Sequence, residues 1–224
     1  MILYVKAAED GTSVGDCPFA QYVRLVLEEK GLEYDVRPCT PETKPQWLID
    51  LFEGKMPALR HRKECYTESE VIAQYLEFFF SNSISMSKPS KNEMRSAEDA
   101  IDGIFPSIAK YLKHTPDGDE MDDELREGLV ESLKRLDAHL SAGDRSGPYL
   151  VGSGKEITLL DCGLAPKLYH MSVGLKEFKS NVIDIATSFP AVEKYMQTMF
   201  NRESFVNTMY SSETVVWGWS NARS

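Results

Sequence analysis

The sequence has few cysteines and few positive charges, and it has no long hydrophobic run. Its 224 residues include only four cysteines, at positions 17, 39, 65 and 162. They are too few and too scattered for a disulfide framework, which is typical of a reducing compartment. A formal net charge of −10 argues against nucleic acid or an anionic membrane as the main partner. No apolar segment approaches the roughly 20 residues that span a bilayer.

Metal-binding motifs and targeting signals are also missing from the sequence. The histidines and cysteines show no metal-ligand spacing, so we expect no metal site. The chain opens on a strand-like segment at residues 2–5 and not on a signal peptide. We therefore expect a cytoplasmic protein, or a plastid protein if a transit peptide has been removed. We also expect a monomer with no permanently bound cofactor.

A change of pattern near residue 80 predicts two domains joined by a linker. Residues 1–80 alternate strand and helix patterns in the order βαβ and then αββα, which predicts a thioredoxin-like α/β domain with a second strand at 33–37. Residues 81–92 are polar and rich in serine, as in a linker. Residues 93–224 predict an all-α domain. We expect one helix over 93–114, a capping box from Thr158 to Asp161, and a last long helix led by Phe189 and Pro190.

Cys17 is the most reactive residue that the sequence predicts. Pro18 suits the first position of a helix, and apolar residues follow at helical spacing, at 19, 22, 23, 26 and 27. Cys17 then occupies the N-cap, where free backbone N–H groups and the helix dipole lower the pKa of a thiol. We therefore predict a reactive thiolate. The alternative is a small buried cysteine that happens to precede a helix.

Two further features of the first domain are expected to lie in one pocket with Cys17. Pro57 enters a strand after the turn at Gly54, and in thioredoxin-like folds a cis proline at this place faces the cysteine. Glu68 and Ser69 stand at the start of a helix. A carboxylate, a hydroxyl and helix N–H groups suit a ligand that carries both an ammonium and a carboxylate. The alternative for these two residues is an ordinary helix N-cap.

Together with the capping box in the helical half, these features resemble the glutathione transferase superfamily over the whole chain. Within it, five blocks resemble plant-type dehydroascorbate reductases: residues 5–8, 15–19, 44–47, 54–57 and 164–170. The resemblance implies the glutathione transferase fold and an enzyme that reduces dehydroascorbate to ascorbate with glutathione as co-substrate. Cys17 is then the nucleophile, and oxidised glutathione is the second product.

The resemblance also implies which residues bind the two ligands. For glutathione they are Lys6, Asp16, Lys44, Met56, Pro57, Glu68 and Ser69, and for dehydroascorbate they are Lys6, Asp16, His170 and Trp219. Other interpretations stay open. The two lysines are also compatible with a solvated surface, His170 with helix packing, and Trp219 with docking of the tail. Asp16 opposes a thiolate by like charge, so we interpret it as a ligand of substrate hydroxyls or of the helix N-terminus.

The sequence departs from the family pattern in the linker, at Ala20, where a serine is usual, and at Trp217, an extra tryptophan. Since no second thiol follows Cys17 in the helix, an external thiol must reset the oxidised enzyme. We predict that the other three cysteines are buried small hydrophobes. Two alternative functions remain: an omega-type glutathione thiol transferase acting on mixed disulfides, and a chloride intracellular channel-like protein. The latter is disfavoured because no segment of the first domain is long and apolar enough to insert.

Overall fold

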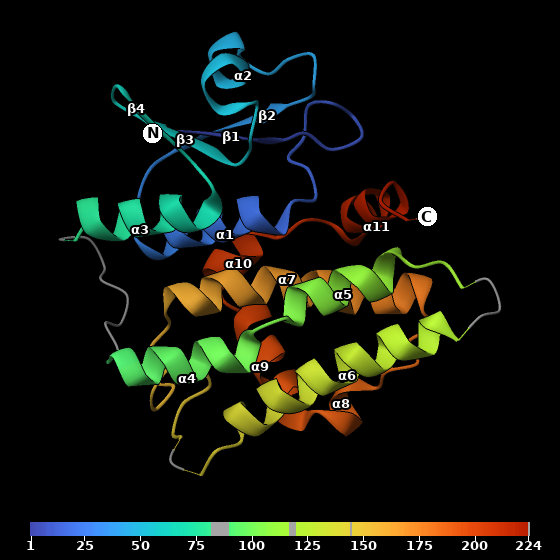
Figure 1. Ribbon diagram of the computed structural model, residues 1–224. Helices are drawn as coiled ribbons and strands as arrows, with labels where there is room; N and C mark the ends of the chain where they lie inside the picture. Colours follow the sequence, from blue (N-terminus) through green and yellow to red (C-terminus); the bar gives the residue numbers. More distant parts are fainter. Residues whose placement is uncertain (82–89, 117–119, 144, 224) are drawn as a thin grey trace.

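A four-stranded mixed sheet with three helices forms the first part of the chain (Figure 1). The structure is a computed structural model that describes residues 1–81, 90–116, 120–143 and 145–223. In chain order the elements are β1 (Ile2–Lys6), α1 (Pro18–Glu29), β2 (Asp35–Cys39), α2 (Gln46–Phe52), β3 (Ala58–His61), β4 (Glu64–Thr67) and α3 (Ser69–Phe79). The strand order is β2-β1-β3-β4, with β1 parallel to β2 and the other pairs antiparallel. This is the thioredoxin-like arrangement that the sequence predicts.

The alternation of side chains along β1 places helices on both faces of the sheet. Leu3 and Val5 are fully buried in the main core, to which α1 and α3 contribute. Tyr4 points to the opposite face, where it packs with Leu48 of α2 and Ala58 of β3 in a second cluster. Because successive residues of a strand face opposite ways, an apolar run of this length requires cover on both sides.

The second part of the chain is helical, and one helix forms its centre. Its elements are α4 (Lys91–Ile101), α5 (Ile104–Lys113), α6 (Met121–Leu140), α7 (Leu159–Phe178), α8 (Ile185–Ser188), α9 (Pro190–Phe200), α10 (Glu203–Thr208) and α11 (Ser212–Ser220). Helix α7 contacts α1, α5, α9 and α11. Its capping box is present as predicted: the buried Asp161 carboxylate accepts hydrogen bonds from the amide and the hydroxyl of Thr158, both at 2.8 Å. Asp161 is therefore structural.

The expectation of one helix over 93–114 is wrong. The chain forms α4 and α5, and the break lies at Gly103, whose φ of +73° is left-handed. The proline inside the predicted helix, Pro106, is the third residue of α5. There its missing N–H costs no intrahelical bond. Helix α4 begins at Lys91, two residues before the expected start of the second domain, because Ser90 and Glu93 form a capping box. The rest of the expected linker, residues 82–89, lies outside the described residues.

Two other boundaries also differ from the prediction. The last long helix expected after Phe189 is three helices, α9, α10 and α11, because the chain turns at 201–202 and again at 209–211. Strand β2 begins at Asp35, two residues later than the polar–apolar alternation suggested. Its position is set by pairing with β1, in which Ile2 lies opposite Asp35.

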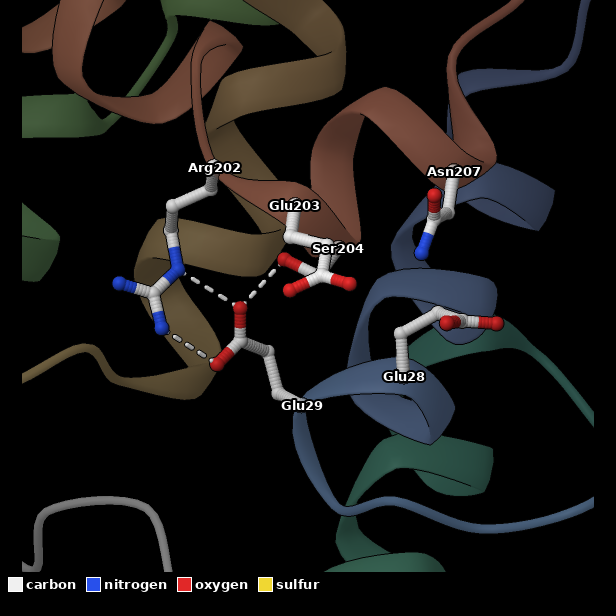
Figure 2. Close-up of a pocket in the computed structure, with 6 residues that line it drawn as sticks. All are labelled: Glu28, Glu29, Arg202, Glu203, Ser204 and Asn207. Carbon is white, nitrogen blue, oxygen red and sulfur yellow. Dashed lines mark hydrogen bonds and ion pairs between the residues drawn. The ribbon is translucent and has the colours of Figure 1, made fainter.

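A charged cluster joins α1 to α10, and Figure 2 shows its side chains. Glu29 accepts two hydrogen bonds from Arg202, each of 2.7 Å, and a third from the hydroxyl of Ser204. Burial alone raises the pKa of Glu29, but these hydrogen bonds outweigh it and hold that pKa below its usual value. The cluster therefore fixes the first part of the chain to the helical part.

No helix within the described ranges is both long and apolar enough to cross a membrane.

Candidate active site

The edge of the sheet at the end of β1 collects most of the residues that the sequence predicts for the site. In the antiparallel pair of β1 and β3, Tyr4 lies opposite Ala58. This is the last pair of the β1–β3 ladder. Lys6, at the end of β1, and Met56, two residues before β3, therefore lie at the same end of the sheet.

The pairing of β3 with β4 adds the start of α3 to this edge. Ala58 lies opposite Thr67, so the same register sets Pro57 beside Glu68. The Met56–Pro57 bond is cis, as predicted. Ser69 begins α3 directly after Glu68. Strand topology alone thus brings Pro57, Glu68 and Ser69 to the edge that carries Lys6.

Lys44 reaches this edge from the loop after β2. Its Cδ and Nζ atoms lie 3.3 Å from the position that a Cβ would take on Gly54, in the turn before Met56. That turn has a positive φ at Gly54, +67°, and only glycine adopts such a conformation without cost. Lys44 therefore lies across the turn and is half-buried there, not free on the surface.

Glu68 does not act as an ordinary N-cap. It is the residue before α3, but its side chain makes no capping hydrogen bond. Its φ of +68° is strained for a residue with a Cβ. The carboxylate is 67% exposed and lies 3.9 Å from Lys55. A strained residue with an exposed carboxylate at a helix N-terminus is suited to hold an ammonium group of a ligand.

Cys17 is the N-cap of α1, as predicted, with an extended backbone (φ −73°, ψ 114°). The chain reaches it from β1 through a tight return in which the Gly15 amide donates to the Lys6 carbonyl at 2.8 Å. A Cβ on Gly15 would lie 2.6 Å from the Ala7 carbonyl oxygen, so no other residue fits. This close approach of backbone to backbone places the thiol next to the end of β1.

The expectation of a lowered thiol pKa is wrong. Burial raises the pKa of Cys17, and the Asp16 carboxylate adds to the rise. The amides of Ala20 and Phe19 and the Lys6 ammonium act in the opposite direction, but they do not outweigh the loss of water. The helix N-terminus is therefore present and favours the thiolate, while desolvation keeps the resting sulfur protonated.

Lys6 and Asp16 form an ion pair beside the thiol. The Lys6 Nζ atom lies 2.8 Å from Oδ1 of Asp16, and the two side chains are 47% and 14% exposed. Asp16 therefore does not cap α1, which was one of our two interpretations. The pair supplies one cation and one hydrogen-bond acceptor at the mouth of the site.

His170 and Trp219 lie on the helical side of the site. His170 is 1% exposed, and its ring lies 6.1 Å from that of Trp219 in an edge-to-face arrangement. Burial lowers the pKa of His170 to about 4; the Asp16 carboxylate opposes this to a smaller extent, and the Lys6 ammonium adds to the lowering. The imidazole is therefore neutral at pH 7. Within the described part of the chain, His170 Nε2 and Trp219 Nε1 are buried without a hydrogen-bond partner. Such unsatisfied groups are costly unless a ligand or water completes them.

The sequence did not predict two further residues beside the start of α1, Tyr210 and Lys167. Tyr210 donates a hydrogen bond of 3.0 Å from its hydroxyl to the Cys17 carbonyl, and it lies 193 residues further along the chain. No local pattern signals such a contact. Lys167 lies over the rings of Phe19 and Phe105, at 5.7 and 5.8 Å. It stands three residues before His170 on α7, so helical spacing alone could have placed it on the same face.

Of the other three cysteines, Cys39 ends β2 opposite Lys6, but its side chain packs in the second cluster with Tyr4 and Leu48, while Cys65 lies on β4 and Cys162 on α7. All are free; Cys39 and Cys162 are buried, as predicted, whereas Cys65 is only half-buried on β4. Cys39 on β2 and Cys65 on β4 are separated by β1 and β3. Across the ranges that the structure describes, no three histidine, cysteine or acidic side chains cluster in a way that could hold a metal.

The comparisons with known proteins agree with this geometry. Models of the glutathione S-transferase N-terminal and C-terminal domains match residues 12–83 and 93–198. The glutathione S-transferase DHAR2 of Arabidopsis thaliana is 37% identical over 217 residues, which covers 96% of this chain and 94% of that protein. The chloroplastic DHAR3 of the same plant is 33% identical over 207 residues, 92% of this chain and 74% of that protein. A crystal structure of Chlamydomonas reinhardtii dehydroascorbate reductase superposes with a TM-score of 0.79 at 27% identity, covering 99% and 97% of the two chains.

Proposed function

The chain belongs to the glutathione S-transferase family, and from that premise we propose that it is an enzyme that reduces dehydroascorbate to ascorbate with electrons from glutathione. The observation that carries the mechanism is Cys17 at the N-cap of α1, beside the Lys6–Asp16 pair, with Ala20 and not a second cysteine one turn later. A single thiol at a helix N-terminus can attack the substrate but cannot reset itself.

The reaction balances with one dehydroascorbate and two glutathione molecules. The Cys17 sulfur adds to a carbonyl carbon, and water then attacks the sulfur. The carbon–sulfur bond breaks, its electron pair enters the ring, and ascorbate leaves with two added hydrogens. The cysteine is left as a sulfenic acid. One glutathione thiol condenses with it and releases water, and a second attacks the mixed disulfide and releases oxidised glutathione.

The side chains of the sheet edge divide into two groups by their chemistry. We assign Lys44, the Met56–Pro57 backbone, Glu68 and Ser69 to glutathione, since a cation, an exposed carboxylate and a helix N-terminus match its two carboxylates and its ammonium. We assign His170 and Trp219 to dehydroascorbate. The buried ring N–H of Trp219 and the neutral His170 suit the hydroxyl and carbonyl oxygens of an uncharged substrate. Lys6 and Asp16 serve both.

An assay of ascorbate absorbance with glutathione and dehydroascorbate tests this proposal. We expect turnover with oxidised glutathione formed in equal amount. Cys17→Ser should reduce it about 1,000-fold or more while the folded protein still binds glutathione. Cys65→Ser, which removes a half-buried thiol from β4, is the matched control and should retain activity.

A second substrate separates the proposal from a thiol transferase. If the enzyme turns over a glutathione mixed disulfide readily and dehydroascorbate hardly at all, the assignment to dehydroascorbate is wrong, although Cys17 would keep its role.

We further propose a monomer that works in a reducing compartment, the cytoplasm or, as for the relative named chloroplastic, a plastid. Four free cysteines support the reducing compartment. Light scattering after size-exclusion chromatography measures the oligomeric state, and a particle twice the chain mass would contradict the monomer.

A further inference from the structure

The final helix, α11, lies beside the start of α1 and carries two consecutive residues to the Lys6–Asp16 pair (Figure 1). The Lys6 ammonium lies 4.9 Å from the centre of the Trp217 ring. A Cβ on the next residue, Gly218, would lie 1.7 Å from Oδ2 of Asp16, so that carboxylate packs directly on the helix backbone. One element thus contacts both members of the pair.

Lys6 needs such a support because its own strand does not hold it. The side chain is 47% exposed, and a lysine stem at a strand end has several open rotamers. A cation over the face of an indole is attracted by the ring quadrupole. Asp16 fixes one N–H of the ammonium at 2.8 Å, and the indole covers another side of it. The ammonium has three donors, so at least one remains for a bound ligand.

Helix α11 is anchored by other residues than Trp217. Val215 is fully buried and Trp219 is 7% exposed, while Ser211 caps the helix through the Thr214 amide. Trp217 is only half-buried and faces Lys6. These contacts hold α11 in place without Trp217, so the side chain of Trp217 can act on Lys6 without being needed for the fold.

We propose that Trp217 is a positioning residue, which holds the Lys6 ammonium against Asp16 and so sets the positive charge that meets a negatively charged ligand next to Cys17. This inference rests on the proposed function in one respect, namely that the ligand in question is the anionic glutathione. Its physical content, a fixed cation beside the thiol, is independent of the reaction.

Alkylation of Cys17 measures that charge without any reductase assay. Iodoacetate is an anion and iodoacetamide is neutral, so the ratio of their rates with Cys17 reports the local cation. We expect Trp217→Leu to lower this ratio about two- to fivefold, the range expected for a lost cation–π contact, and Trp217→Phe to keep most of it. Lys6→Met should lower the ratio at least as far.

The double variant decides whether Trp217 acts through Lys6. In the Lys6→Met background, Trp217→Leu should cause no further change, since the group it positions is gone. Val216→Ala, a truncation on the same helix that keeps the indole, controls for loosening of α11 and should match the parent. In kinetics, Trp217→Leu should raise KM for glutathione by a similar factor and change kcat less.

Three results would overturn the inference: an unchanged ratio in folded Trp217→Leu, the same loss in Val216→Ala, or an equal further loss in the Lys6→Met background. If Trp217→Leu does not fold by circular dichroism, Trp217→Met against Trp217→Phe provides the same comparison of aliphatic with aromatic. A parent protein without dehydroascorbate reductase activity would refute the proposed function alone, because the alkylation ratio would still test Trp217.

Discussion

Cys17 illustrates how one residue receives opposing effects from its surroundings. Backbone amides at the start of α1 and the Lys6 ammonium favour the thiolate, while burial and the Asp16 carboxylate favour the thiol. Burial has the largest effect, so the net shift of the pKa is upward. The helix N-terminus was readable from the sequence, whereas the burial involves residues distant along the chain, such as Tyr210, which no local pattern encodes.

The pH dependence of Cys17 alkylation follows from this balance. Because the pKa of Cys17 is raised, the thiolate is a minor form at neutral pH, and its fraction grows about tenfold per pH unit until the pKa is passed. We therefore expect the rate with iodoacetamide to climb steadily from pH 6 to pH 8, measured by peptide mass spectrometry. A rate that is already constant across this range would mean that the thiolate dominates and that the helix N-terminus outweighs burial. Cys162, fully buried, serves as the unreactive internal reference.

At the scale of the elements, the sequence patterns predicted correctly whether a segment is a helix or a strand, but they did not predict where several helices begin and end. Helices α1 and α3 follow the period that burial on one face dictates, and β1 is a short apolar run buried on both faces, so the presence of all three was predictable. The break at Gly103 was not. The sequence predicted one helix that runs through Pro106, whereas Pro106 lies in the first turn of α5, where a proline fits without distortion. The positive φ of Gly103 turns the chain out of the helical conformation between α4 and α5.

Two glycine substitutions test this assignment. Gly103→Ala should lower the free energy of unfolding by about 1 kcal/mol, since alanine is strained at φ +73° although no neighbour lies closer than 3.8 Å to the new Cβ. Gly128→Ala, on the exposed face inside α6 where nothing lies within 4 Å, should raise it by up to about 1 kcal/mol. Urea unfolding followed by circular dichroism measures both. If both substitutions changed the free energy of unfolding in the same direction, Gly103 would not be the conformational break between α4 and α5.

At the scale of the whole molecule, the site exists only because two halves of the chain meet. The order and directions of the strands bring Lys6, Met56 and Glu68 to one end of the sheet. From the far end of the chain, Tyr210 reaches the Cys17 carbonyl and Trp217 reaches the Lys6 ammonium. Their places depend on how α9, α10 and α11 fold back over α1. The sequence predicted one long helix there, so it could not predict those contacts.

The charged cluster of Figure 2 joins those halves through an ion pair with two hydrogen bonds, so the stability of their contact depends on pH. Glu29 has a folded-state pKa below its usual value, so it stabilises the fold above about pH 4.5, and that stabilisation is lost as pH falls through the lowered pKa. Arg202→Met removes two hydrogen bonds of 2.7 Å and leaves the largely buried carboxylate with Ser204 alone.

We expect Arg202→Met to lower the free energy of unfolding at pH 7 by about 1–3 kcal/mol. In a chain of 224 residues this corresponds to a fall in Tm of about 2–4 °C per kcal/mol. The gap in the free energy of unfolding between variant and parent should narrow as pH falls through the lowered pKa of Glu29, because the carboxylate then becomes protonated in both. Glu203→Gln is the matched control, because Glu203 is exposed and lines the same pocket as Glu29 and Arg202. It should change the free energy of unfolding little at neutral or acidic pH. A gap that does not narrow at any acidic pH at which both proteins stay folded would show that Arg202 acts through packing on Tyr149 and not through the charge of Glu29.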